Sequence, residues 1–412
     1  MNRLLPLTIC LALATACGQA AEPAPDTAVR HAPFASSTAT DLGTLGGSTS
    51  YAADINNPGV VVGYATTETG LIHAFRWTAR TGMTDLGTLP GGTQSGAVRI
   101  LNSGRILGWS ETATGRRIPV QWSARGEIRA LDIARLPEVS FMEPSDFNER
   151  GEVVGSGVSN ELHGWYWSRE TGTIDLNDRV PSCSENSATA INASGLLVGT
   201  HCALSTGTLR SYTLRVHGLL HDLSVGDDIF NANSVGFGIN QAGTVAGWLD
   251  PHGNITTSAT TWSGDRGFTL LPNLASGFPS GYATAVNNRG VAVGVSWDEG
   301  ADTYVAIAWP SATRLVRLDG GVPQFAVATA INDNGLVVGA GASAAGPSRA
   351  LLWELSAGRT ESVVSPGGAA AEERPRHALA SQLAPSGPAA CLTDRRVMGS
   401  KAGLAGCVMG VK

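Results

Sequence analysis

Four aromatic side chains recur at similar places in the sequence and are of a type that binds ligands. Tyr64, Trp109 and Trp248 each directly follow a glycine, and Trp297 lies three residues after Gly294. Such side chains stack on sugar rings or anchor a protein partner, because each joins a large apolar area to one polar group. The alternative is that they pack against neighbouring elements of the fold. The sequence leaves both interpretations open.

Two pairs of cysteines have the chemistry of disulfides. Cys183 and Cys202 flank the Asn192 to Gly195 segment at nearly equal distances, so an antiparallel hairpin would bring them opposite each other. A metal site that uses the adjacent His201 lacks two further ligands. Near the C-terminus, Cys391 and Cys407 are able to pair with each other. The sequence therefore predicts one disulfide and allows a second.

Linear motifs of catalysis are not found. The chain has no HExxH, no Gly-x-Ser-x-Gly, no phosphate loop and no calcium-loop spacing. His217 and His221 are four residues apart, but in a strand this spacing does not create a ligand-bearing face, so we interpret them as surface or packing residues. We predict no catalytic residue, metal or cofactor.

The elements that must position these residues follow from an internal repeat. Each copy begins with an apolar residue and Asn, which are followed by a turn Gly, three mostly apolar residues and a second Gly. The turn glycines are Gly59, Gly104, Gly151, Gly195, Gly243, Gly290 and Gly335, separated by 45, 47, 44, 48, 47 and 45 residues. Asn at the first position and Gly at the fourth favour a type I turn. Leu101 replaces the Asn in one copy.

Each turn joins two strands, a third strand ends in Trp (Leu214 in the fourth copy), and a fourth carries an Asp-Leu pair. Four strands in about 45 residues form one propeller blade, so seven copies predict an all-β, seven-bladed β-propeller of four-stranded blades. The alternatives are a β-sandwich array and a solenoid. The strand before each turn is rich in small residues and is predicted to be innermost. We expect Asp41 to Leu45, rather than Glu361 to Val364, to complete the seventh blade.

The propeller is predicted to span residues 41–365, with its longer second-to-third-strand loops and blade connections on one face. Residues 1–16 have the positive start and short apolar stretch of an export signal. Cys17 follows Ala14-Thr15-Ala16 and is the candidate for lipidation, whereas ordinary secretion is the alternative. Residues 17–40 are typical of a disordered tether, and residues 366–412 of an irregular Pro/Gly/Ala-rich tail.

Composition excludes few functions. The net charge of −6 gives no reason to attract nucleic acid or an anionic membrane surface. We therefore expect contact with a membrane only through the N-terminal lipid.

One segment resembles a known family. His73-Ala74-Phe75-Arg76-Trp77, flanked by two Asp-Leu-Gly-Thr-Leu copies and the Ile55-Asn56 turn, is similar to the bacterial extracellular HAF-repeat family. The resemblance covers about residues 40 to 365, and His163 to Trp167 is a partial echo. It implies export and repeated β structure, but no activity and no catalytic residues.

The function predicted from the sequence is a binding or interaction module at the bacterial cell envelope, with an unidentified protein or glycan as ligand. We expect a monomeric outer-membrane lipoprotein, or a secreted or periplasmic protein if Cys17 is not lipidated. One alternative is an extracytoplasmic propeller enzyme acting on glycans or another envelope substrate, since propeller enzymes assemble sites from several blades. The other is a purely structural surface repeat protein.

Overall fold

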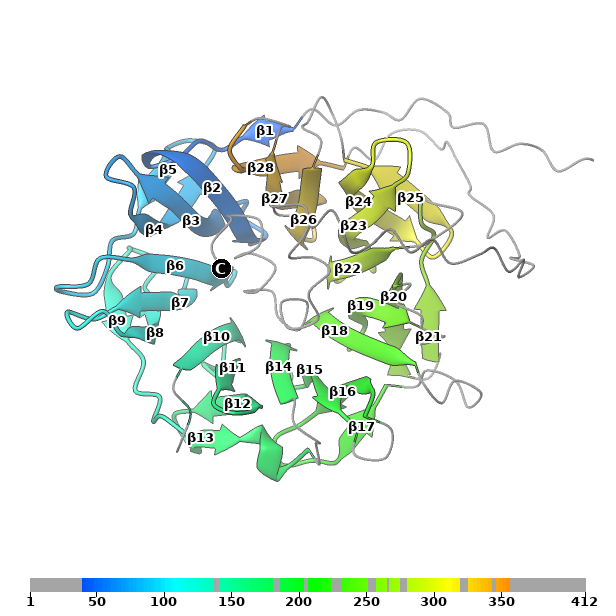
Figure 1. Ribbon diagram of the computed structural model, residues 1–412. Helices are drawn as coiled ribbons and strands as arrows, with labels where there is room; N and C mark the ends of the chain where they lie inside the picture. Colours follow the sequence, from blue (N-terminus) through cyan, green and yellow to red (C-terminus); the bar gives the residue numbers. More distant parts are fainter. Residues whose placement is uncertain are drawn as a thin grey trace, which may run out of the picture.

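The chain folds as a ring of seven four-stranded antiparallel sheets, which confirms the seven-bladed β-propeller (Figure 1). The computed structural model describes residues 39–136, 139, 141–180, 186–203, 207–223, 232–250, 257–264, 267–274, 280–318, 325–342 and 346–355. Cys17, Cys183, Cys391 and Cys407 lie outside these residues, as do the predicted signal peptide, nearly all of the tether, and the tail. Among the described residues, no helix has the length and apolar character that crossing a bilayer requires.

The blades follow one another along the chain. The first consists of β2 (Gly46–Ile55), β3 (Val61–Thr67), β4 (Ile72–Thr78) and β5 (Gly82–Asp85). The second consists of β6 (Ser95–Ile100), β7 (Ile106–Glu111), β8 (Arg117–Trp122) and β9 (Ile128–Ala130). The third consists of β10 (Phe141–Phe147), β11 (Val153–Val158), β12 (Leu162–Ser168) and β13 (Gly172–Asp175), followed by the short 3-10 helix η1 (Leu176–Asp178). The fourth consists of β14 (Asn186–Ile191), β15 (Leu197–Cys202), β16 (Leu209–Leu214) and β17 (Leu220–Asp222).

The remaining blades complete the ring. The fifth consists of β18 (Asn233–Ile239), β19 (Val245–Asp250), β20 (Ser258–Ser263) and β21 (Gly267–Leu270). The sixth consists of β22 (Gly281–Val286), β23 (Ala292–Asp298), β24 (Thr303–Ser311) and β25 (Arg314–Arg317). The seventh consists of β26 (Phe325–Ile331), β27 (Leu336–Ala342), β28 (Arg349–Glu354) and the N-terminal β1 (Thr40–Asp41).

The N-terminal segment closes the ring, as predicted. β1 pairs with β28, and the Leu42 amide adds a hydrogen bond of 2.9 Å to the Ala350 carbonyl. The strand is shorter than the predicted Asp41 to Leu45, because Gly43 has a φ of +87° and turns the chain out of the sheet. Its competitor, Glu361 to Val364, lies outside the described residues.

The two glycines of each repeat have separate physical roles. The seven turn glycines all have φ between +75° and +85°, and in each turn the glycine amide donates to the carbonyl of the residue three positions earlier. The second glycine lies under a bulge in the first strand. A Cβ there would approach a backbone carbonyl oxygen of that strand to 1.8–2.1 Å at all seven positions. Only glycine therefore allows the inner strand to bend onto its neighbour.

The ends of the third strands supply much of the core. Trp122, Trp262, Trp309 and Trp353 are buried, whereas Trp77 and Trp167 are half-buried. Trp122 packs with residues of the first blade, and its Nε1 donates to the Leu86 carbonyl at 2.9 Å. Each buried tryptophan thus joins adjacent blades, and burial of a large side chain contributes roughly 1.5–3 kcal/mol.

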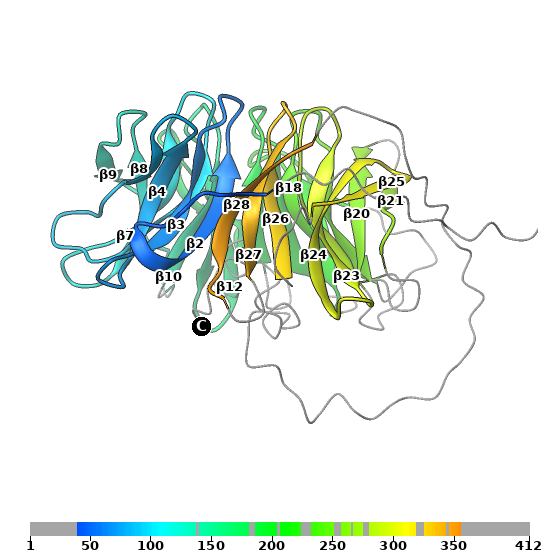
Figure 2. The same ribbon diagram turned by 90° about the horizontal axis from the view of Figure 1, so that it is seen from above.

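The strands run between the two faces of the ring (Figure 2). One end of each blade carries the tight Asn-Gly turn and the third-to-fourth-strand turn, and we name this end the turn face. The other end carries the second-to-third-strand loops and the connections between blades, and we name it the loop face.

Candidate functional site

Hydrogen bonds between neighbouring turns connect most of the ring. In six blades the Asn of the turn is buried and uses both ends of its amide. Its Oδ1 accepts an amide hydrogen within its own turn, and its Nδ2 donates to a backbone carbonyl of the next blade. The Nδ2 bonds run at 3.0–3.1 Å from Asn56 to Leu101, Asn148 to Asn192, Asn192 to Asn240, Asn240 to Asn287, Asn287 to Asn332 and Asn332 to Asn56.

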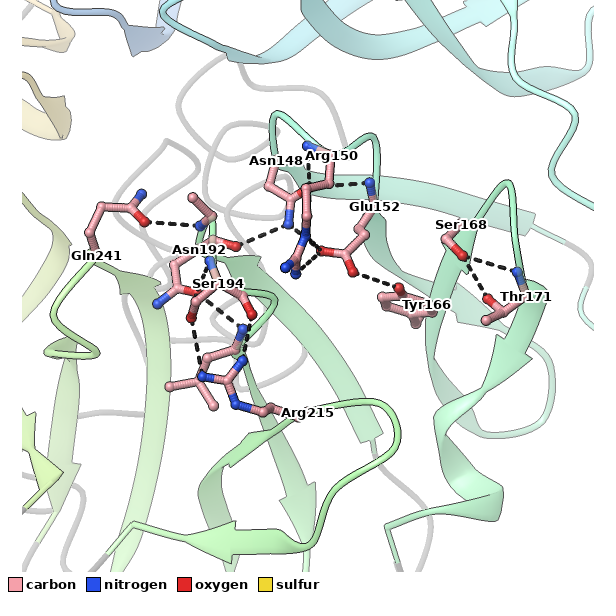
Figure 3. Close-up of polar contacts among 12 residues, drawn as sticks. Asn148, Arg150, Glu152, Tyr166, Ser168, Thr171, Asn192, Ser194, Arg215 and Gln241 are labelled. Carbon is pink, nitrogen blue, oxygen red and sulfur yellow. Dashed lines mark hydrogen bonds and ion pairs between the residues drawn. The ribbon is translucent and has the colours of Figure 1, made fainter.

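Figure 3 shows this connection between the third, fourth and fifth blades. Asn148 donates to the Asn192 carbonyl, and Gln241 accepts from the Ala193 amide at 3.0 Å. Glu152 accepts from Asn148, from Arg150 and, at 3.0 Å, from the Tyr166 hydroxyl. Burial opposes ionisation of Glu152, but these hydrogen bonds outweigh it and lower the pKa of its carboxyl. Burial and Glu152 together raise the pKa of Tyr166 to about 12.

The series is interrupted between the second and third blades, which we call the 2–3 junction, because the Leu101 side chain has no amide to donate. An ionic group lies next to the interruption. Arg99 Nε is 2.9 Å from Asp146 Oδ1, and Arg99 Nη1 is 3.3 Å from Asp54 Oδ1. The other carboxylate oxygens accept the Ile100 and Ile191 amides, both at 2.9 Å. These three charged side chains therefore join the first four blades.

This ionic group lies at the turn-face mouth of the central channel, which forms a cavity of about 180 Å³. Burial opposes the charge on Arg99, but Asp146 and Asp54 outweigh it and raise the pKa of the guanidinium. Both carboxylates are engaged by Arg99 and by backbone amides, so the arrangement matches a structural clamp better than a catalytic acid and base. Among the described residues, no group of three or more His, Cys, Asp or Glu side chains is placed to hold a metal ion.

Two further cavities flank the 2–3 junction. The loop-face cavity measures about 380 Å³ and is lined by Thr112, Thr114, Arg116, Arg117, Ile118, Pro119, Leu131, Ile133, Arg135, Phe141 and Met142. The turn-face cavity measures about 630 Å³ and is lined by Arg105, Gln121, Arg129, Ala130, Leu131, Asp132, Phe147, Arg150, Gly151, Val153, Trp167, Ser168, Arg169 and Gly172. Each combines arginines with apolar side chains, which suits an amphiphilic anionic ligand.

Trp109 is the predicted aromatic residue that lies beside one of these cavities. The Arg117 guanidinium stands 4.0 Å from its ring centroid, a cation–π contact. Arg117 Nε is also 4.0 Å from Glu111 Oε1, and the Glu111 carboxylate accepts from Thr93 at 2.6 Å and from Gln94 at 3.1 Å. Burial raises the pKa of the neighbouring Glu143, and the charge of Arg117 only partly opposes this rise. β7 therefore carries Trp109 and Glu111, which hold the Arg117 guanidinium in place on the loop face.

The other three predicted aromatics contact a different group of residues. Trp248 is buried in an apolar cluster from the first, fifth, sixth and seventh blades, and Tyr64 and Trp297 pack against the same cluster. Tyr64 stacks on Tyr51 at 5.2 Å between centroids, and Trp297 meets Tyr304 edge-on at 5.1 Å. These contacts agree with the interpretation that the three aromatic side chains pack against neighbouring parts of the fold. A binding role for Tyr64, Trp109, Trp248 and Trp297 stays a prediction, and the structure does not bring the four together.

The predicted disulfide stays a prediction because Cys183 lies outside the described residues, although Cys202 ends β15 and is buried. His201 contacts Asp222, with 3.0 Å between Nε2 and Oδ1, and meets the Tyr212 ring edge-on. His217 and His221 are exposed.

The histidine of the His-Ala-Phe segment has a structural partner that the sequence did not reveal. His73 Nδ1 is 2.7 Å from Asp85 Oδ2, and His163 Nδ1 is 2.9 Å from Asp175 Oδ2 in the third blade. The Asp of each Asp-Leu pair also accepts the amide two residues later, at 2.7 Å for Gly87 and 2.9 Å for Asn177. The His and Asp motifs therefore hold the third and fourth strands together.

The ionic clamp was also missed, although the sequence contains a signal for it. Counting two residues back from the Asn position of each turn, the first three blades have Asp54, Arg99 and Asp146. The other four have Ala190, Gly238, Ala285 and Ala330. Charged residues of alternating sign therefore occupy this position in three consecutive blades, whereas the other blades have small residues there. This pattern indicates contact between the three blades.

Comparison with protein-family models and with curated protein sequences gives no match. Among solved structures, the β-propeller domain of the Trilobed protease from Pyrococcus furiosus is similar with a TM-score of 0.50 at 10% identity, covering 74% of this chain and 95% of that one. The acylaminoacyl peptidase of Pyrococcus horikoshii gives 0.51 at 9% identity, covering 76% and 52%. A structure from a study of two prolyl endopeptidases gives 0.51 at 11% identity, covering 78% and 50%.

These likenesses show the propeller fold. The matched part of this chain spans about half the length of the last two proteins. The Trilobed protease domain is described as having an open velcro topology, whereas β1 and β28 pair to close the ring here.

Proposed function

We propose that this protein is an extracytoplasmic binding module whose loop-face cavity at the 2–3 junction binds a ligand that carries an anionic group. The observation that supports this most is the placement of Arg117 against Trp109 beside a cavity of about 380 Å³. Arg116 and Arg135 also line the cavity, together with the apolar Ile118 and Phe141. Guanidinium groups bind carboxylates or phosphates with two parallel hydrogen bonds, and the apolar wall holds the rest of the ligand.

The position of Arg117 favours binding over a purely structural role. The stacked indole and the Glu111 carboxylate restrict its side chain before any ligand arrives, so less conformational entropy is lost on binding. Its side chain still keeps 30% of its surface exposed, which leaves donors available to a ligand. A preorganised and accessible guanidinium beside an apolar wall is the usual composition of a specific anion site.

The test is a binding screen of the full-length chain against acidic and neutral glycans and acidic peptides, followed by variants. Arg117→Gln is expected to weaken the best anionic ligand at least about tenfold, the loss of one charge-assisted contact. Arg210→Gln is the matched control, because Arg210 lies near the loop-face end of β16 in the fourth blade. Equal affinity of R117Q and R210Q for the ligand would rule out the loop-face cavity as the site.

We also propose that the chain reaches the envelope through its N-terminus, with Cys17 as the lipidated residue. The small residues before Cys17 and the short apolar stretch support this proposal. Mass spectrometry of the mature N-terminus is expected to find a diacylated Cys17, and Cys17→Ser is expected to release the protein from the membrane fraction. A mature chain that begins at another residue would contradict it.

Glu143 supports a second candidate function, an enzyme acting on glycans. A carboxyl whose pKa is raised by burial stays protonated to higher pH than usual, which suits a general acid. Under this alternative, the glycan that binds best is cleaved, and Glu143→Gln abolishes turnover while affinity is retained. If the bound glycan stays intact over long incubation with the wild-type protein, the binding function stands alone.

A further inference from the structure

The four arginines that line the turn-face cavity differ in whether a neighbouring carboxylate neutralises their charge. Arg105 Nη2 is 2.8 Å from Glu149 Oε2, and Arg150 Nη2 is 2.6 Å from Glu152 Oε2, so an adjacent carboxylate neutralises each of these two cations. Arg129 donates to Gln121, a neutral amide. Arg169 forms no hydrogen bond or ion pair with the residues that the structure describes. Two of the four cations are therefore available to a ligand.

The two arginines without a carboxylate partner, Arg129 and Arg169, are accessible, and the carboxylate of Asp132 lines the same cavity. Arg129 and Arg169 are both exposed, and they come from different blades, on β9 and on the β12–β13 turn. Asp132 is the carboxylate that lines the same cavity, and it is exposed as well. The four arginines exceed this single lining carboxylate and the carboxylates of Glu149 and Glu152 by one charge. The cavity keeps a net attraction for anions.

An aromatic wall completes the cavity. Trp167 lines it and, like the equivalent Trp77, is half-buried, whereas Trp122, Trp262, Trp309 and Trp353 have at most 2% of their surface exposed. Phe147, Val153 and Leu131 provide further apolar lining. Part of an indole thus remains uncovered beside free guanidinium groups. A flat apolar surface next to cations fits a ring that has one apolar face and a carboxylate on its edge.

We propose that the turn-face cavity is a second binding site, specific for the uronate residues of an acidic polysaccharide. The pyranose ring stacks on Trp167, and its carboxylate pairs with Arg129 or Arg169. A chain of such sugars places carboxylates at regular intervals, which matches two free cations on neighbouring blades. An acidic peptide offers carboxylates on flexible side chains but no rigid apolar ring face, so the half-buried indole of Trp167 favours the sugar. This site uses different arginines from those of the loop-face cavity, although Leu131 lines both cavities.

The experiment measures binding of the full-length protein to a galacturonate oligosaccharide, to its methyl-esterified form and to a poly-glutamate peptide of similar charge. The galacturonate oligosaccharide is expected to bind, with a change in tryptophan fluorescence, and the ester is expected to bind at least about tenfold more weakly. Affinity is also expected to fall as salt is raised, because the contacts are ionic. Stronger binding of poly-glutamate than of the galacturonate would overturn the proposal in favour of a peptide site.

Variants locate the site. The double variant R129Q/R169Q is expected to lower galacturonate affinity at least about tenfold, since each substitution removes one free cation. Arg80→Gln is the matched control, because Arg80 is an exposed arginine on the corresponding turn of the first blade. Unchanged affinity in R129Q/R169Q would overturn the proposal. Galacturonate affinity that is lost in R117Q but kept in R129Q/R169Q would place this ligand in the loop-face cavity, so failure of the loop-face site and failure of this one are distinguishable.

Arg80, Arg129 and Arg169 are exposed, so R80Q and R129Q/R169Q are expected to keep the wild-type circular dichroism and thermal midpoint. Trp167→Phe gives an independent readout, because it keeps an aromatic ring but reduces its area. A small loss of affinity together with loss of the fluorescence change is expected. If the fluorescence change persists in W167F, another tryptophan reports binding and the proposed stacking is wrong.

Discussion

The seventh and first blades meet in a different way from the second and third. At the 7–1 junction, Asn332 Nδ2 donates to the Asn56 carbonyl at 3.0 Å, and Thr329 Oγ1 donates to the Ala52 carbonyl at 2.8 Å. Asp333 and Asn57 add a reciprocal pair of 2.9 and 3.0 Å. Small residues along the inner strands let the blades approach closely enough for these short side chains to reach backbone carbonyls.

At the 2–3 junction the corresponding bonds are replaced by longer, charged side chains. The Leu101 side chain cannot donate a hydrogen bond, and Arg99 instead reaches Asp54 and Asp146 on either side. Arg105 and Ser103 contact Glu149 across the same junction. Two cavities flank this junction, and the partly covered Trp167 lines one of them. Short side chains therefore hold the blades where these lie close together, and longer ionic side chains hold them where cavities remain between the blades.

The largest effect is expected from removing the ionic clamp. Arg99→Met leaves two carboxylates buried, with side-chain exposures of 5% and 3%, and without their cation. Loss of one partner of a buried ion pair costs about 3–5 kcal/mol, so the free energy of unfolding in urea is expected to fall by that amount. Arg349→Met, at the exposed pair with Asp41, is the control and is expected to cost less than about 1 kcal/mol. Equal costs would show that the clamp adds nothing beyond a surface pair.

An intermediate effect is expected at an intact turn. Asn287→Ala removes the donor to the Asn332 carbonyl and the acceptor for the Val291 amide, both buried or half-buried. Loss of a buried hydrogen-bond partner costs roughly 1–3 kcal/mol. Asn102→Ala removes the exposed acceptor of the Asn57 amide and is expected to cost less, under about 1 kcal/mol. If urea unfolding gives the same cost for both, the Asn series does not stabilise the ring.

A smaller effect is expected from repairing the interruption. Leu101→Asn places an amide where it can donate to the Asn148 carbonyl, but it removes a side chain that packs against the core of the junction. These contributions oppose each other, so the net change in unfolding free energy is expected to stay below about 1 kcal/mol. Hydrogen exchange is the sharper measurement, because the new Oδ1 should protect the Arg105 amide. Unchanged exchange at that amide would mean that the turn does not adopt the geometry of the other six.

The smallest effect is expected from Glu143→Gln, and it depends on pH. Burial raises the pKa of Glu143 in the folded protein, so ionisation at higher pH disfavours the fold. The folded state therefore binds the proton more tightly than the unfolded chain, and stability falls as pH rises through the folded pKa. E143Q is expected to have a higher thermal midpoint than wild type at about pH 8 and the same midpoint at about pH 4. A difference that is independent of pH would contradict this.

Much of the fold was predictable from particular residues. The seven turn glycines, the Trp at the ends of third strands and the Asp-Leu pairs predicted four strands per repeat, and Asp41 and Leu42 predicted closure from the N-terminus. These signals are local: a turn needs its Gly at positive φ, and a strand needs its apolar residues, whichever blade lies beside it.

The candidate sites were less predictable. The place of Trp109 after Gly108 was visible in the sequence, but its contact with Arg117 depends on the pairing of β7 with β8, which the sequence does not specify. The arginines of the turn-face cavity come from two blades, and their availability depends on which carboxylates lie near them. Individual spacings carry little information on such contacts.

By itself the sequence determined the repeat, the number of blades and the turn chemistry, because each follows from interactions between residues that are neighbours along the chain. Only the tertiary structure decided that Asn56 and its counterparts hold adjacent blades together, that Arg99 bridges the interruption at Leu101, and that Trp167 remains partly uncovered. Those outcomes depend on side chains about 45 residues apart, or at opposite ends of the chain, which meet only when the ring closes.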